Sequence, residues 1–243
     1  MTRVATCFGT LAAANAKAPF ALLNLLTRVK RPTMQTAIFL AGILSATLVI
    51  AANAEIPNDP TMVHPLPVGA RAPAFTARTK DGITRTFRPD GYAQPTIVIF
   101  YRGGWCPYCN MQLSDMRLAE PKLREQGFEI VFLSTDRPQI LYSSLKETDI
   151  HYTLLSDSHL EAAKAFRVAY RLDDATLEKQ RKYGVDLDQT TGASLHELPV
   201  PSVFIIDKSG TIRYVYCNPD YKIRLGADAL LAAAEPYATV KDK

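Results

Sequence analysis

Strand-like and helix-like hydrophobic patterns alternate along most of this chain. The strongest strand signal is the uninterrupted run of β-branched and aromatic residues at 96–101, which is typical of a central strand buried on both faces. Further strands are expected at 129–134 and 152–155, and helices at 139–147, 160–166 and 227–238. Because strands alternate with helices, the pattern predicts an α/β domain built from βαβ units with right-handed crossovers.

Two hairpins are expected in addition to these units. Segments 75–77 and 83–87 surround Lys80-Asp81-Gly82, and segments 202–206 and 211–216 surround a turn that ends at Gly210. Glycine supplies the positive φ that such turns require. Hairpins pair strands antiparallel and βαβ units pair them parallel, so the sequence predicts a central mixed β-sheet flanked by helices.

Two segments lie outside this pattern. Residues 167–197 are polar, with acidic and basic side chains interspersed, which indicates a solvated helix-and-loop insertion. We expect an insertion rather than a second domain, because the segment has too few apolar residues for a core of its own. Residues 55–67 are proline-rich without apolar periodicity and predict an extended linker. The folded domain is therefore expected at 68–240.

The first 54 residues differ from the rest in charge. They contain five basic residues and no acidic one, so the chain's net charge of +4 becomes −1 from Glu55 onward. An apolar run at 37–52 follows Arg31, and Ala52-Asn53-Ala54 fits the small-x-small rule for cleavage before Glu55, which together predict a signal peptide. The alternative is an uncleaved N-terminal membrane anchor. Both place the domain outside the cytoplasm, in a periplasmic or periplasm-facing location, with the membrane as a partner only if the leader stays attached. The near-neutral remainder gives no indication of a nucleic-acid-binding surface, and no nucleic-acid partner is expected.

The chain has four cysteines, and two of them carry the candidate chemistry. Cys106-Pro107-Tyr108-Cys109 follows the strand at 96–101 and two glycines, and it opens a segment with apolar residues at helical spacing. The free N–H groups and positive dipole of a helix N-terminus favour a thiolate at Cys106, which is the expected nucleophile. Cys109 lies one helical turn further on, close enough to bridge, and is the expected resolving thiol.

The cysteines also have interpretations other than redox catalysis. A zinc site needs about four ligands, and the histidines are scattered, so no metal is expected. A purely structural bridge over two residues removes little entropy from the unfolded chain. Cys217, which follows the last predicted strand, is interpreted as a half-buried thiol, with a third redox cysteine as the alternative. Cys7 leaves with the leader.

A resemblance to a known family rests on three segments. They read Val68-Gly-Ala-Arg-Ala-Pro-Ala-Phe75, Phe100-Tyr-Arg-Gly-Gly-Trp-Cys-Pro-Tyr-Cys-Asn-Met-Gln-Leu113 and Pro201-Ser-Val-Phe-Ile-Ile-Asp207. Between residues 68 and 237 the chain thereby resembles the peroxiredoxin-like branch of the alkyl hydroperoxide reductase/thiol-specific antioxidant (AhpC/TSA) family. The resemblance implies a thioredoxin-like fold with extra N-terminal strands and one inserted helical or loop segment. We expect a redox-active Cys106–Cys109 disulfide at this site, with Arg102, Trp105, Pro107, Tyr108 and Pro201 as supporting residues.

The chain departs from that family at positions near the cysteines. The family commonly has Thr or Ser three residues before the reactive cysteine and proline seven before it, where this chain has Gly103 and Ile99. An arginine is common where Pro201 stands. A thioredoxin has a cis proline at the corresponding place, so we expect Val200-Pro201 to be cis, with an ordinary trans proline as the alternative. Arg102 is the nearest cation in sequence that could activate a peroxide, or it is a salt-bridge partner at the strand end.

Two functions are expected from these features. As a peroxiredoxin-like antioxidant peroxidase, the protein reduces peroxides through the Cys106/Cys109 pair and is recycled by an external dithiol such as a thioredoxin-like protein. As a thiol-disulfide oxidoreductase of the thioredoxin type, it acts on protein disulfides instead. A non-catalytic binding role is the third possibility. No cofactor is expected for any of them.

Overall fold

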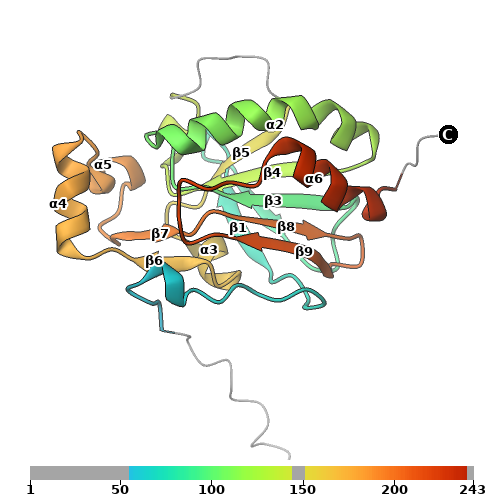
Figure 1. The fold of residues 1–243 in the computed structure, drawn as a ribbon, viewed down its shortest axis with the longest axis horizontal. Coiled ribbons are helices and arrows are strands. Elements are labelled where there is room, and N and C mark those ends of the chain that lie inside the picture. The colour runs from blue at the N-terminus through green and yellow to red at the C-terminus, as the bar shows by residue number, and fades with distance from the viewer. Residues whose placement is uncertain (1–54, 144–150, 240–243) are drawn as a thin grey trace, which may run out of the picture. The chain divides into compact units, whose positions relative to one another are not determined.

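A seven-stranded mixed sheet forms the centre of the computed structural model, which describes residues 55–143 and 151–239. Its strands are β1 (Phe75–Arg78), β2 (Thr84–Phe87), β3 (Thr96–Phe100), β4 (Glu129–Ser134), β5 (Thr153–Ser156), β8 (Ser202–Ile206) and β9 (Ile212–Cys217). In space they follow the order β2-β1-β5-β4-β3-β8-β9 (Figure 1). Strands β3, β4 and β5 are parallel, whereas β8 is antiparallel to β3 and to β9. The predicted central mixed sheet and both predicted hairpins are confirmed.

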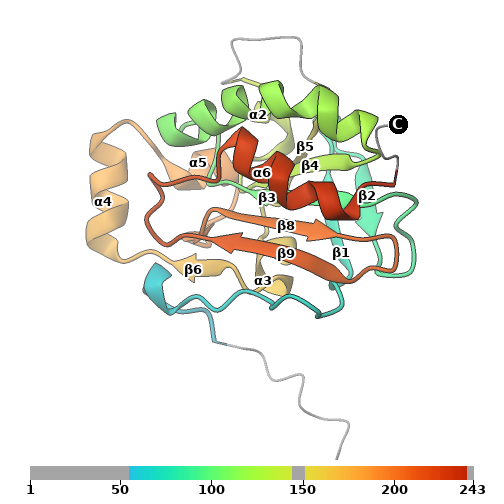
Figure 2. The same ribbon diagram turned by 45° about the vertical axis from the view of Figure 1, so that its right-hand side comes forward.

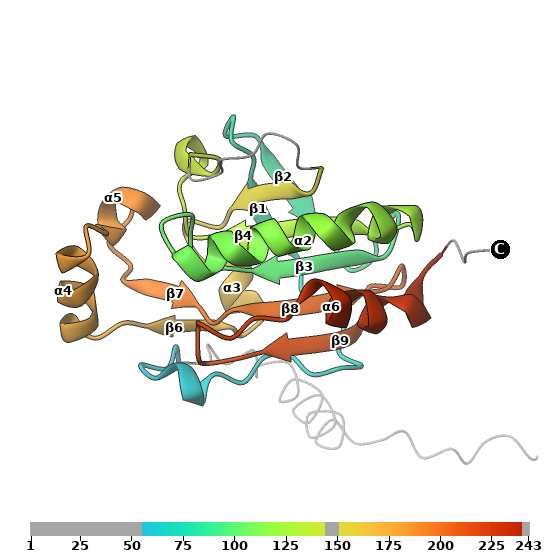
Figure 3. The ribbon, with the colours of Figure 1, turned by 45° about the horizontal axis from the view of Figure 1, so that its top comes forward.

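Helices cover both faces of this sheet. Strand β3 is buried along its whole length, so successive side chains enter two different cores. Ile97 and Ile99 pack with helices α2 (Pro107–Glu125) and α6 (Ala227–Ala234), while Val98 and Phe100 pack against the side that carries α3 (Glu161–Ala165). Figure 3 shows α2 and α6 lying across the same face. A fully buried β3 gives the sheet a rigid centre, and the chemistry of the chain begins where that strand ends.

The polar insertion is more ordered than the sequence suggested. It contains strand β6 (Ala169–Arg171), helix α4 (Asp174–Lys182), helix α5 (Leu187–Thr191) and strand β7 (Glu197–Pro199), with β6 and β7 paired antiparallel. The expectation that it has too few apolar residues for a core is wrong, because side chains from these elements form a small buried cluster that includes Leu177, Leu187 and Leu198. Figure 2 shows α4 and α5 beyond the end of the sheet, close to the start of α2.

The remaining segments differ in how far the structure describes them. Residues 55–67 include a 3-10 turn at Pro60–Met62, and they bond to the body through Leu66 N–H to Phe166 O and Arg171 N–H to Pro57 O. Where a helix was expected at 139–147, the structure has a 3-10 turn, Pro138–Ile140, followed by a turn to residue 143, and residues 144–147 lie outside the described residues. The expected leader, residues 1–54, also lies outside them. Across residues 55–143 and 151–239, every helix is too short or too polar to cross a bilayer.

Candidate active site

Cys106 stands at the N-cap of α2, directly after the loop that leaves β3. Two hydrogen bonds fix this loop: Gly104 N–H donates to Asp136 Oδ2 at 2.7 Å, and Asn110 Nδ2 donates to Gly104 O at 2.9 Å. Pro107 occupies the first turn of α2, as predicted, where a missing N–H costs nothing. Burial raises the pKa of Asp136 to about 7. The hydrogen-bonded glycine loop and the start of α2 together fix the position of Cys106 at the end of β3.

The loop has no room for a side chain at Gly103. Its φ is +156°, and a Cβ there would lie 2.3 Å from Trp105 Nε1 and 2.7 Å from Asp136 Oδ1. Those distances are shorter than a contact between non-bonded atoms allows, so a larger residue at 103 requires the indole or the carboxylate to move. Packing of Trp105 and Asp136 thus explains why glycine stands where related proteins commonly carry Thr or Ser.

The two thiols of the pair have opposite proton affinities. Both are free and buried in this structure. The Cys109 thiol donates a hydrogen bond to Cys106, and this bond, together with the Cys109 backbone N–H and the charges of Arg102 and Arg224, lowers the pKa of Cys106 to about 6. Burial, followed by the bond it donates to Cys106, raises the pKa of Cys109 well above its usual value. The pKa of Cys106 is thus lowered, as its place at the start of a helix predicts, and the hydrogen bond from the neighbouring thiol is the largest cause.

Arg102 brings a positive charge to the same site. Its guanidinium lies between two rings, 4.9 Å from the centroid of Trp105 and 4.3 Å from that of Tyr221. The side chain is 3% exposed, and no carboxylate pairs with it among residues 55–143 and 151–239. The salt-bridge alternative for Arg102 therefore finds no partner in that part of the chain. Its charge is free to act on Cys106 and on an anion beside it.

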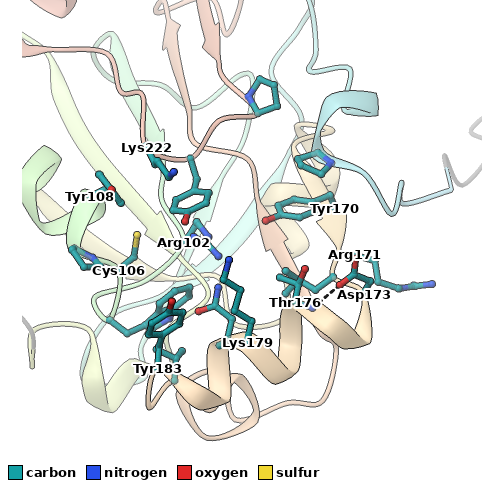
Figure 4. A pocket seen from close by; sticks show the side chains of 18 of the residues that line it. Arg102, Cys106, Tyr108, Tyr170, Arg171, Asp173, Thr176, Lys179, Tyr183 and Lys222 are labelled. Atoms are coloured by element: carbon teal, nitrogen blue, oxygen red, sulfur yellow. Dashed lines mark hydrogen bonds between the residues drawn. The ribbon is translucent and has the colours of Figure 1, made fainter.

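Cys106 opens into a pocket whose far wall is the insertion. The pocket has a volume of about 860 Å³, within the range of about 300–1,000 Å³ typical of small-molecule sites. Lys179 from α4 and Lys222 from the loop after β9 line it with Arg102 (Figure 4). Its aromatic lining consists of Trp105, Tyr108, Tyr170, Tyr183 and Tyr221. Trp105 and Tyr108, singled out from the sequence, thus belong to the pocket wall beside Cys106.

The pocket is electropositive. Lys179 and Lys222 have no ion-pair partner within the described segments, whereas Arg171 at the rim bonds to Glu197 at 2.9 Å and turns away from the pocket (Figure 4). The acidic side chain in the lining, Asp173, already accepts a hydrogen bond from Thr176 N–H at the start of α4. An anionic ligand with an apolar body therefore has both cations and rings to contact.

Pro201 and Cys217 are not part of the pocket lining: Pro201 directly precedes β8, and Cys217 is the last residue of β9, paired with Ser202. The expectation of a cis Val200-Pro201 bond is wrong, because the described residues contain no cis peptide. The chain runs extended from β7 directly into β8, and a trans proline fits the residue before a strand, where no N–H is needed. Cys217 is half-buried, as expected; burial raises its pKa, which a hydrogen bond with Ser202 partly offsets.

Sequence reasoning missed four polar residues around the cysteine pair, namely Asp136, Lys179, Lys222 and Arg224. They come from three segments, because Lys222 and Arg224 share the loop between β9 and α6. None of the four follows a motif spacing relative to Cys106, so nothing local in the sequence singles them out. Lys179 lines the pocket only because of the way the insertion folds. Among the described residues, no cluster of three or more potential metal ligands occurs.

Comparisons with known proteins match this architecture. Residues 68–215 match the family described as AhpC/TSA. The chain is 27% identical over 191 residues to a chloroplastic peroxiredoxin Q of Oryza sativa subsp. japonica, with 76% of this chain and 77% of the relative covered. It is 29% identical over 106 residues to peroxiredoxin Bcp of Escherichia coli (strain K12), covering 44% and 67%. The crystal structure of peroxidoxin BcpB from Mycobacterium tuberculosis superposes with a TM-score of 0.50 at 20% identity, covering 71% and 98%. The structural likeness confirms the predicted thioredoxin-like fold.

Proposed function

This chain belongs to the AhpC/TSA family, and from that premise we propose that it is a peroxiredoxin-like thiol peroxidase acting through Cys106 and Cys109. The observation that carries the proposal is the lowered pKa of Cys106, about 6, at the base of an accessible pocket. A thiol with that pKa is largely thiolate at neutral pH, and the thiolate is the nucleophile.

The reaction proceeds in two chemical steps. The Cys106 thiolate attacks one oxygen of the peroxide, the O–O bond breaks, and the other oxygen leaves and is protonated to an alcohol or water, which leaves Cys106 as sulfenic acid. Cys109 then loses its proton and attacks the Cys106 sulfur. The S–O bond breaks, hydroxide leaves and takes up that proton as water, and a Cys106–Cys109 disulfide forms. An external dithiol, such as a thioredoxin-like protein, reduces the disulfide and restores both thiols.

The pocket favours organic hydroperoxides with an acidic group. Its volume of about 860 Å³ is far larger than hydrogen peroxide requires, its rings offer apolar contact, and Lys179 and Lys222 offer a counter-charge. The basic residues of the pocket come from three segments of the chain, of which the insertion supplies one. Peroxide selectivity thus depends on how α4 lies relative to α2.

The second candidate function is thiol-disulfide exchange on proteins. Gly103 favours it, because the loop lacks the hydroxyl that related peroxidases place three residues before the cysteine. The trans bond at Pro201 removes the other argument for it. Peroxidase activity remains the better-supported function.

Side-by-side assays on one sample decide between the two functions. Reduced protein is supplied with a thioredoxin system and either hydrogen peroxide or cumene hydroperoxide, and the same sample is tested for insulin reduction. We expect peroxide-dependent turnover that is lost in Cys106→Ser, with little insulin reduction. Insulin reduction without peroxide turnover would establish the oxidoreductase function instead.

We further propose that the protein is exported to a periplasmic compartment. The support is the basic start, the apolar run at 37–52 and Ala52-Asn53-Ala54. Expression of the full chain in a bacterium, followed by fractionation and N-terminal sequencing, tests this. A periplasmic product that begins at Glu55 is expected. A product that starts at Met1 in the membrane fraction indicates an anchor, and one in the cytosol contradicts export.

A further inference from the structure

Arg224 reaches the sulfur of Cys109 from the loop before α6. Its Nη2 lies 3.3 Å from Cys109 Sγ, Nη1 donates to Gln112 Oε1 at 2.9 Å, and Nε donates to Tyr221 O at 2.8 Å. Gln112 is buried one turn after Cys109 on α2. Three hydrogen bonds fix the position of the Arg224 guanidinium. Its partners belong to α2 and to the loop before α6, so two separate segments hold it against the sulfur.

The contacts form a chain of donors that ends at the reactive sulfur. Arg224 donates to Cys109, and the Cys109 thiol donates to Cys106. Cys109 is completely buried, and burial opposes its ionisation; the charge of Arg224 acts in the other direction. A thiol inside an apolar core needs such a cation if it is to act as a nucleophile.

We propose that Arg224 is a catalytic residue of the resolving step, where it stabilises the Cys109 thiolate. This inference rests on the proposed function and adds a residue to it. When Cys109 attacks the sulfenic acid on Cys106, its proton must leave first, and the guanidinium holds the resulting anion until the S–S bond forms and hydroxide departs. In the later reduction of the disulfide, an external thiolate attacks Cys106 and forms a mixed disulfide with it, the Cys106–Cys109 bond breaks, and Cys109 leaves as a thiolate that the same guanidinium stabilises.

The fluorescence of Trp105 offers a direct readout of both steps. Trp105 is the only tryptophan of the chain and is adjacent to Cys106. Rapid mixing of the reduced full-length protein with hydrogen peroxide should give a first phase whose rate rises with peroxide concentration and a second phase independent of it. The second phase reports disulfide formation. The comparison includes the parent, Arg224→Gln, Arg224→Lys and Arg213→Gln. Arg213→Gln is the control because Arg213, on β9, lies outside the pocket and pairs with Asp207.

We expect the second phase to slow about tenfold in Arg224→Gln for each pKa unit by which Cys109 becomes harder to ionise. Its pH midpoint should move upward, the first phase at pH 8 should change little, and sulfinic acid should accumulate on Cys106 by mass spectrometry. Arg224→Lys, which keeps the charge, should restore part of the rate, and Arg213→Gln should match the parent. Thermal melting verifies that each variant is folded.

Two results would overturn the role of Arg224 alone. One is a normal first phase with an unchanged second phase in Arg224→Gln. The other is equal slowing in Arg224→Gln and Arg224→Lys with no movement of the pH midpoint, since that indicates lost packing rather than lost charge. A parent protein without any peroxide-dependent phase would instead contradict the peroxidase function, and this inference with it.

Discussion

The burial of Cys109 and the hydrogen bond that it donates to Cys106 together favour Cys106 as the nucleophile. Cys109 donates to Cys106, and that bond is the largest of the interactions that lower the pKa of Cys106 to about 6. Stabilising the charged form of a group makes its proton easier to remove. The rate of reaction with peroxide should therefore rise with pH through a midpoint near 6 and level off at higher pH, where Cys106 is fully ionised.

Cys109→Ala removes the donor while leaving the helix and Arg102 in place. We expect the pH midpoint of the first oxidation step to move upward in this variant, toward the value of about 8.5 for an ordinary cysteine thiol. Rates of Cys106 oxidation between pH 5 and 9 measure it, with Cys217→Ser as the matched control because that thiol lies on β9. An unaltered midpoint in Cys109→Ala would mean that the helix and the arginines suffice.

The resolving role of Cys109 predicts a product as well as a rate. Cys109→Ser should react with peroxide and then stop at Cys106 sulfenic acid or at an intermolecular disulfide, so multiple turnover is lost. Dimedone labelling followed by mass spectrometry identifies the sulfenic acid. If Cys109→Ser continues to turn over and Cys109→Ser/Cys217→Ser does not, Cys217 is the resolving thiol.

Residues at motif spacing could be predicted from the sequence, and those brought in by the fold could not. Cys106 and Cys109 lie one helical turn apart, so their proximity follows from the helix alone. Arg224 is 115 positions after Cys109 and contacts it only because α6 packs on α2. Asp136 holds the loop before Cys106 from the end of another strand.

The tight packing around Gly103, in the loop between β3 and α2, leads to a prediction about stability and activity. Gly103→Ala should lower the melting temperature and the peroxidase rate, because overpacking costs about 1–3 kcal/mol and displaces Trp105 or Asp136. Gly103→Thr, which adds the hydroxyl common in related proteins, should be worse. Gly91→Ala is the matched control, since a Cβ there meets only ordinary contacts at 3.6 and 3.8 Å. Higher activity in Gly103→Thr would show that the loop adapts to a peroxide-binding hydroxyl.

Most strands and helices of the domain could be predicted from the spacing of hydrophobic residues, because their buried positions recur regularly along the chain. The expected strand at 129–134 matches β4 residue for residue, and the uniformly apolar run at 96–101 became the fully buried β3. Pro201 is different. Its isomer depends on the path from β7 into β8, which no local pattern around the proline specifies.

At the scale of the whole molecule, the insertion forms one wall of the pocket beside Cys106. Its polar sequence predicted a solvated helix-and-loop segment, yet buried residues from its elements form a small core beneath α4, which lines the pocket. The buried face could not be recognised from the sequence because it is assembled from four short elements with no shared period. A segment that reads as a surface loop thereby becomes one wall of the site.

Lys179 on α4 tests whether that wall selects substrates. Lys179→Ala should raise the KM for a carboxylate-bearing organic hydroperoxide up to about fivefold, because a partly exposed ion pair contributes roughly 0.2–1 kcal/mol. The KM for hydrogen peroxide should stay the same. Lys182→Ala on the same helix, outside the pocket lining, is the control. Equal changes in KM for both peroxides would show that Lys179 does not select between substrates.

The central claim is that peroxide converts the Cys106 and Cys109 thiols into one disulfide. The most direct measurement is peptide mapping by mass spectrometry of the fully reduced protein, quenched after one equivalent of hydrogen peroxide. We expect both thiols to be lost together, a Cys106–Cys109 disulfide to appear, and Cys217 to remain free. Recovery of Cys106 as an unreacted thiol, or its pairing with Cys217, would contradict the account.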